Sequence, residues 1–252
     1  KLDKEHSSFE RTVEQVRSVF GNQCVPVALP VGQQAALKQV VSVLAGGAVP
    51  GEAAAAHQAA VEALAEAAAE QDDKLLEAYL GGEKLSADQV RQGVRAGTVA
   101  GKIVPIYGGS ADKDLGVKEL LDGITGLLPS PVERGTTTSA DGQPVTLRDD
   151  GPFSGLVWKV TVDPYAGQLA YVRVMTGVLK ANAELVNTTR GGKEKIGQLL
   201  RIQGKTQAPV DQAGPGEIVA LAKLKDTHLN DTLADAGGSV RYAPIQFPRP
   251  VA

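Results

Sequence analysis

Three residues at the start of the chain, Lys1-Leu2-Asp3, could recognise a guanine base. A carboxylate can accept two hydrogen bonds side by side, as the N1–H and exocyclic amine of guanine require, and a lysine stem can lie against the ring. Alone, such a triplet is more typical of a solvated turn. Its interpretation as a base-binding element depends on a second feature, which lies near residue 110.

That second feature is a predicted strand over residues 103–107, which runs into Gly108-Gly109-Ser110-Ala111 before a helix begins near Gly116. Small residues at the carboxyl end of a strand let backbone N–H groups approach a base closely, at the edge where open α/β sheets bind ligands. Ser110 and Ala111 are therefore predicted to contact guanine through the backbone, together with Lys1 and Asp3.

Other reactive residue types form no catalytic pattern. Residues 97–102 are one residue shorter than a GxxxxGK phosphate loop, and Ile103 stands where Ser or Thr would bind Mg²⁺. The three histidines are scattered, and no histidine lies near Ser110 in sequence to act as a base. We predict no catalytic residue and no metal site in this sequence.

The length, net charge, cysteine content and hydrophobicity of the chain limit the kinds of protein it can be. A length of 252 residues suits one large or two ordinary domains. A net charge of −3 means that any contact with RNA must use a local basic patch. The single Cys24 is expected to be a buried thiol in a reducing cytoplasm. No apolar run approaches the ~20 residues that span a bilayer. We expect a cytoplasmic monomer with no membrane or DNA partner.

The first half of the chain alternates predicted helices and strands. Ser7-Ser8-Phe9-Glu10 predicts a helix start, residues 24–29 a strand, and the Ala-rich residues 50–80 a long helix that can break near Asp72-Asp73. A second capping box at Ser86 opens a helix to about residue 96, and a helix over 116–128 ends at Pro129.

Beyond Pro131 the hydrophobic period becomes two. Strand-like runs at 156–162, 168–178, 182–188, 195–203 and 216–223 are separated by turn residues, which predicts a small antiparallel β-barrel. Trp158 alternates with Val157 and Lys159, and is expected in the barrel core. The predicted domains are residues 1–131, with an insertion at about 31–100, a linker at 132–149, the barrel at 150–245 and a further linker at 246–252.

These features together resemble elongation factor G. Lys1-Leu2-Asp3-Lys4 is similar to the end of the N-K-x-D guanine motif, and Gly109-Ser110-Ala111 to the last guanine motif of that family. Further along the chain, the resemblance to domain II includes Asp163-Pro164-Tyr165-Ala166-Gly167, Tyr171-Val172-Arg173-Val174, Asn187-Thr188-Thr189, and Gly214-Pro215-Gly216-Glu217-Ile218; the ending Phe247-Pro248-Arg249-Pro250-Val251 resembles the linker to a third domain.

The resemblance implies an α/β GTPase-domain remnant with a helical insertion, followed by a translation-factor domain II barrel. It implies that the parent protein binds GTP or GDP with Mg²⁺ and couples hydrolysis to a ribosomal step such as translocation. The phosphate loop and switch segments are expected to precede Lys1, so this part of the protein should be inactive alone. The alternatives are a ribosome-protection or release-factor-type GTPase, and a nonenzymatic paralogue that acts as an interaction module.

Departures from the family pattern favour a divergent paralogue, and one of them is the exceptionally Ala-rich insertion at 51–80. Leu29-Pro30-Val31-Gly32 continues into Gln33-Gln34-Ala35, and Gly191-Gly192 stands where the translocase tends to carry an arginine. The resemblance also implies that domain II contacts small-subunit ribosomal RNA. The basic residues that could do so are Arg190, Lys193, Lys195, Arg201 and Lys205. A solvated surface is the alternative interpretation of these five residues.

Overall fold

The computed structural model describes residues 1–164 and 167–248, and the chain divides into two compact units, Lys1–Leu128 and Pro129–Ala252. Tyr165 and Ala166 of the first domain II motif, and residues 249–252 of the predicted terminal linker, lie outside the described residues. No described helix is long and apolar enough to cross a bilayer.

The first unit contains two short sheets. Strands β1 (Cys24–Pro26) and β4 (Val104–Ile106) pair in parallel, whereas β2 (Ala28–Val31) and β3 (Gln39–Ser42) form an antiparallel pair. The single strand expected at 24–29 is thus two strands. Val27 separates them, because its N–H donates to Ile106 while its carbonyl accepts from Val43. Strand β3 lies within the insertion that was expected to be helical.

Helices surround these strands: α1 (Phe9–Phe20), α2 (Ala54–Ala69), α3 (Asp73–Leu80), α4 (Ala87–Val99) and α5 (Val117–Leu127). The predicted break near Asp72 is confirmed, since its carboxylate accepts from the backbone of Lys74 and Leu75 and caps α3. The capping box at Ser86 is also confirmed. The cap of α1 is Ser8 rather than Ser7, whose hydroxyl donates to the carbonyl of Leu2 instead.

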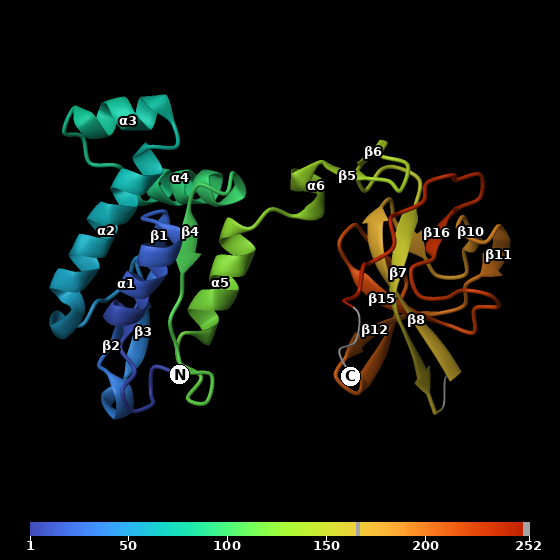
Figure 1. Ribbon diagram of the computed structural model, residues 1–252, viewed down its shortest axis with the longest axis horizontal. Helices are drawn as coiled ribbons and strands as arrows, with labels where there is room; N and C mark the ends of the chain where they lie inside the picture. The colour runs from blue at the N-terminus through green and yellow to red at the C-terminus, as the bar shows by residue number, and fades with distance from the viewer. Residues whose placement is uncertain (165–166, 249–252) are drawn as a thin grey trace. The chain divides into compact units, whose positions relative to one another are not determined.

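The Ala-rich insertion packs closely through small side chains. A Cβ atom placed on Gly93 of α4 would lie 2.7 Å from the Cβ of Ala68 on α2, so only glycine permits this helix contact. Helix α3 projects from the rest of the unit in Figure 1 and has no buried residue. The core beneath the helices is aliphatic and consists of Val25, Val27, Val43, Leu64, Ala68, Val90, Val94, Ile103 and Leu127.

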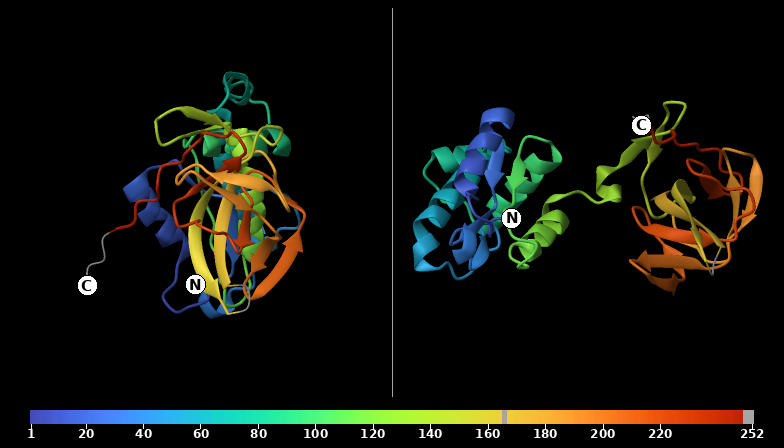
Figure 2. Two further views of the ribbon diagram at one scale, coloured as in Figure 1. Left: turned by 90° about the vertical axis from the view of Figure 1, so that its right-hand side faces the viewer. Right: turned by 60° about the horizontal axis from the view of Figure 1, so that its bottom comes forward.

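The second unit is a curved, barrel-like sheet of eight antiparallel strands, ordered β11-β10-β16-β7-β8-β15-β12-β13 (Figure 2). These are β7 (Ser154–Asp163), β8 (Gly167–Thr176), β10 (Glu184–Asn187), β11 (Gly192–Lys195), β12 (Leu199–Gln203), β13 (Thr206–Val210), β15 (Ile218–Ala222) and β16 (Thr232–Asp235). Two short strands, β9 (Leu179–Lys180) and β14 (Gln212–Ala213), form a separate pair. The predicted fold class, an α/β part followed by a domain II type barrel, is confirmed.

The segment expected to be a linker, 132–149, carries secondary structure. It contains the end of the helical turn α6 (Pro131–Arg134) and the hairpin of β5 (Thr136–Thr138) and β6 (Pro144–Thr146). Leu147 is buried, and Ala140 donates to the carbonyl of Arg241 over 2.7 Å. These residues therefore pack as part of the second unit.

The expectation for Trp158 is wrong. The register between β7 and β8 shifts between Val157 and Lys159, so Trp158 occupies a β-bulge without a partner across the ladder. Val157 and Val160 pack in the core, whereas Trp158 packs edge-on against Tyr171, with ring centroids 6.1 Å apart. The extra residue changes the face on which the following side chains lie.

Candidate functional site

The two segments predicted to bind guanine lie together at one end of the first unit. The backbone nitrogens of Lys1 and Leu2 both contact the carbonyl of Gly109, at 2.7 and 3.1 Å. Lys4 connects the segments a second time, because its ammonium lies 3.0 Å from both Asp3 and Asp112. Residues more than a hundred positions apart are thereby brought into one site.

Asp3 is the central acidic group of this site. Its side chain is only 4% exposed, and the hydroxyl of Ser110 donates to its carboxylate. This hydrogen bond, followed by the contact with Lys4, lowers the pKa of Asp3 from 3.8 to about 2. Its Oδ1 atom is buried and has no hydrogen-bond partner within the described residues. A buried, ionised acceptor without a donor is a feature that a ligand with N–H groups would satisfy.

The loop after β4 has a fixed, tight conformation. Ser110 is 1% exposed, and it exchanges backbone hydrogen bonds with Leu115 at 2.8 and 3.0 Å. A Cβ atom on Gly109 would lie 2.4 Å from the carbonyl of Leu115, which explains the glycine. Ala111 follows on the exposed surface. The structure thus places Ser110 beside Asp3. The backbone N–H of Ser110 already donates to Leu115 and so does not serve a base as predicted, while the contact of the Ala111 backbone with a base stays a prediction.

The glycine-containing run 97–102 has the geometry of a helix end. The N–H groups of Lys102 and Ile103 both donate to the carbonyl of Gly97 at the end of α4. This run precedes a strand rather than connecting a strand to a helix, as phosphate loops do. Among the described residues, no group of three His, Cys, Asp or Glu side chains is arranged to hold a metal ion.

The five basic residues predicted to contact RNA are divided between two parts of the second unit. Lys193 and Lys195 lie exposed on β11, at one end of the strand order, whereas Arg201 and Lys205 belong to the β12–β13 hairpin at the other end. Arg201 is paired with Glu217 at 2.6 Å.

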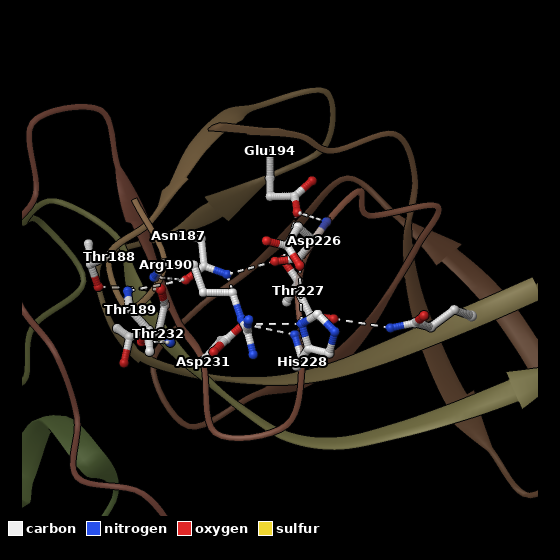
Figure 3. A network of polar contacts seen from close by, with 11 residues as sticks. Asn187, Thr188, Thr189, Arg190, Glu194, Asp226, Thr227, His228, Asp231 and Thr232 are labelled. Atoms are coloured by element: carbon white, nitrogen blue, oxygen red, sulfur yellow. Dashed lines mark hydrogen bonds and ion pairs between the residues drawn. The ribbon is translucent and has the colours of Figure 1, made fainter. Parts of the chain in front are cut away.

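The fifth of these residues, Arg190, belongs to a polar network that sequence reasoning missed (Figure 3). Its Nε donates over 2.8 Å to Oδ2 of Asp231, which is 3% exposed. The same oxygen accepts from the side chain of Asn187 at 2.9 Å and from the backbone of His228 at 2.8 Å. The network connects the turn after β10 to the turn before β16, which gives Arg190 a structural contact.

Glu194 forms a second part of the network (Figure 3). It is 3% exposed and points away from the side of β11 that carries Lys193 and Lys195. Its carboxylate accepts from the backbone of Lys225 and Asp226 and from the hydroxyl of Thr227, at 2.8 to 2.9 Å. The only sequence signal for this role is strand alternation, which places Glu194 opposite its two lysine neighbours.

Comparison with known proteins bears on the fold of the chain. Residues 152–236 match the family model described as elongation factor G domain 2. A crystal structure of a protein from Thermus thermophilus is 27% identical and superposes on 99% of this chain with a TM-score of 0.79. The chain spans 38% of the length of that protein. Residues 152–236 therefore form a domain of the elongation factor G domain 2 family, within a chain whose fold matches that of the Thermus protein over almost its whole length.

Proposed function

We propose that the chain belongs to a ribosome-associated GTP-binding translation factor, which couples GTP hydrolysis to a ribosomal step such as translocation. The observation that carries this proposal is the buried carboxylate of Asp3, held by Ser110 and left with one unpaired oxygen. The match of residues 152–236 to elongation factor G domain 2 supports the translational setting, and association with the ribosome implies a cytoplasmic location.

In this proposal Asp3 accepts the N1–H and the exocyclic amine of guanine. Ser110 orients the carboxylate through its hydroxyl, the backbone N–H of Ala111 donates to the guanine carbonyl oxygen, and the stem of Lys1 lies against the ring. The low pKa of Asp3 keeps it ionised, and therefore a pure acceptor, at neutral pH. Mg²⁺ and the phosphates would be held by the phosphate loop and switch segments, which the family resemblance implies for the complete protein.

The substitution Asp3→Asn tests the proposal in the complete protein. Replacing one acceptor by a donor leaves a guanine N–H unpaired, which costs about 1–3 kcal/mol, or roughly fivefold to more than a hundredfold in GTP affinity. Xanthosine nucleotides carry a carbonyl in place of the amine, so the variant should bind them better than the native protein does. A titration with fluorescent GTP, GDP and xanthosine analogues measures both effects.

Asp112→Asn is the matched control, because Asp112 also contacts Lys4 but is 77% exposed. Its GTP affinity should stay close to that of the native protein. Equal GTP affinities for Asp3→Asn and the native protein would disprove the assignment of the base site.

A further inference from the structure

A groove of about 500 Å³ lies on the outer face of the second unit, opposite the barrel core. Strands β7, β8 and β15 form its base, and α6 and β5 form one side. Its apolar lining includes two surface-exposed isoleucines, Ile218 at 44% and Ile245 at 38% exposed. The apolar residues of this β7–β8 groove are Leu147, Leu156, Trp158, Met175, Ile218 and Ile245. Its volume lies in the range of ligand sites, and its surface is apolar with few polar groups.

The groove is built from positions that the sheet register brings together. Leu156 on β7 and Ile218 on β15 both lie directly opposite Arg173 on β8, on the face away from the core. The side formed by α6 is held against the sheet at Pro131. A Cβ atom on Gly216, which has a φ of +89°, would lie 2.5 Å from the Pro131 ring. The groove is therefore built from segments that pack against one another within the second unit.

The charge of the groove is positive. Arg134 and Arg173 line it, and its lining includes no carboxylate. Both arginines are exposed, and no ion pair joins either of them to an acidic residue in the described part of the chain. An apolar surface with two free guanidinium groups is complementary to a ligand that carries carboxylates beside an apolar side chain.

The groove also offers backbone hydrogen bonds. Ser139 donates to Gln143, and Leu147 donates to Gly135, so alternate pairs of the β5–β6 hairpin are bonded. In an antiparallel ladder this alternation turns the N–H and C=O groups of Thr136 and Thr138 away from β6. No strand pairs with that edge of β5 within the described residues, and Thr136 lines the groove. A strand edge of this kind can accept an extended peptide.

The indole of Trp158 forms part of the groove wall. Its Nε1 is buried and has no hydrogen-bond partner among the described residues, although the ring lines the groove. Buried donors without acceptors are rare and costly.

We propose that the β7–β8 groove binds an extended acidic peptide that carries apolar anchor side chains. The peptide backbone pairs with the free edge of β5, the anchors contact Leu156, Met175 and Ile218, and the carboxylates pair with Arg134 and Arg173. The inference goes beyond the proposed function, because it uses neither the guanine site nor the lysines of β11. It identifies the second unit as a docking module for a protein partner.

The single tryptophan of the chain makes the test direct, because Trp158 lies in the groove and is the only indole fluorophore. The 252-residue protein is titrated with acetyl-Asp-Glu-Leu-Glu-Leu-Asp-amide, which has no aromatic residue. We expect a saturable change in Trp158 emission. A peptide with lysine at the acidic positions, and one with serine in place of leucine, should each cause no saturable change.

Substitutions inside and outside the groove test whether the peptide binds there. Arg173→Gln and Arg134→Gln should each weaken peptide binding about threefold to tenfold, the range of a charged contact at a partly exposed site. Lys180→Gln removes the same charge from an exposed residue of the second unit outside the groove, and should change affinity less than about twofold. Thermal melts establish that each variant is folded.

Three results would overturn the proposal. Equal binding of the acidic and lysine peptides would show that the arginines do not select the ligand. If Lys180→Gln and Arg173→Gln weakened peptide binding equally, the peptide would be responding to the overall charge of the protein and not to the groove. Tighter, Arg173-dependent binding of hexauridylate, with displacement of the peptide, would make the groove a nucleic-acid site instead.

Discussion

At the scale of single residues, the most informative group is Asp3. Its carboxylate is ionised because Ser110 and Lys4 both stabilise the charged form, and burial opposes them only in part. The same two contacts hold it in one orientation. In the proposed base site the carboxylate has to be both charged and fixed before the ligand arrives, and residues from two distant segments hold Asp3 in that state.

The pKa of Asp3 gives a test that needs no ligand. The folded value of about 2 lies below the ordinary 3.8, so the stabilisation from Asp3 is present above pH about 4 and is lost as pH falls through about 2. Ser110→Ala removes the hydrogen bond that lowers the pKa of Asp3 most, so this pKa should rise. The stabilisation from Asp3 should then be lost at a higher pH. Carboxyl ¹³C NMR titration measures the shift.

Ser18→Ala, on the exposed face of α1, is the control for this titration and should leave the pKa of Asp3 unchanged. An unchanged pKa in Ser110→Ala would mean that the hydroxyl does not hold the carboxylate.

At the scale of elements, the second unit depends on polar contacts between its turns as well as on its aliphatic core. Asp231 accepts three hydrogen bonds on one oxygen, from Asn187, Arg190 and His228. Removing a buried carboxylate leaves these donors unpaired. The network therefore holds together the turn after β10 and the turn before β16, and Arg190 contributes one of its hydrogen bonds.

We expect Asp231→Ala to lower the free energy of unfolding by about 3 kcal/mol, as for other broken buried pairs. Asp226→Ala is the matched change, because that carboxylate is 63% exposed, and it should cost no more than about 1 kcal/mol. Urea unfolding followed by Trp158 fluorescence measures both. Similar losses for the two variants would show that the network contributes little.

At the scale of the whole chain, the two units have separate cores, and each can be considered as a folding unit. The first unit contains only a two-stranded parallel sheet, with Val104 of β4 43% exposed, beside the antiparallel pair of β2 and β3. The second contains an eight-stranded sheet and an aliphatic core. Parallel strands are normally covered on both faces, so the sheet of the first unit is the less complete of the two.

Expressed alone, residues 129–248 should therefore unfold cooperatively, whereas residues 1–128 should not. Residues 145–248 should also fold, but with a lower Tm, because they lack the contact of Pro131 with Gly216 and the hydrogen bond of Ala140 to Arg241. Circular dichroism melts compare the three. A cooperative transition for residues 1–128 would contradict this expectation.

The proposed ribosome contact is also a property of the whole protein. Lys193 and Lys195 share the exposed side of β11, while Glu194 between them is buried and bonded. Replacing both lysines with Ala should weaken ribosome binding and flatten its salt dependence by about 0.7–0.9 log units per lost phosphate contact. Pelleting at several salt concentrations measures this, and GTP affinity should not change.

Lys74→Ala with Lys84→Ala is the control, since it removes the same charge from exposed positions in the helical insertion. If both double variants pellet alike at every salt concentration, the lysines of β11 form only a solvated surface.

The sequence by itself determined the features that follow from local rules. The caps at Asp72 and Ser86, the change of period near Pro131, and the family resemblance all depend on residues close together in the chain. The β-bulge at Trp158 was not predictable from the sequence. An extra residue in a strand does not alter the alternation of apolar and polar residues along the chain, but it moves the side chains that follow to the opposite face of the sheet.

Only the tertiary structure decided which distant residues meet. Sequence patterns identified Asp3 and Ser110 as candidates, but their hydrogen bond and the unpaired oxygen of Asp3 depend on the packing of two segments over a hundred residues apart. The same holds for Arg190, whose partner Asp231 follows 41 positions later. A sequence shows which residues are charged or polar. The fold decides which of them interact, because the strength of an electrostatic interaction depends on burial and on the distance between the two groups.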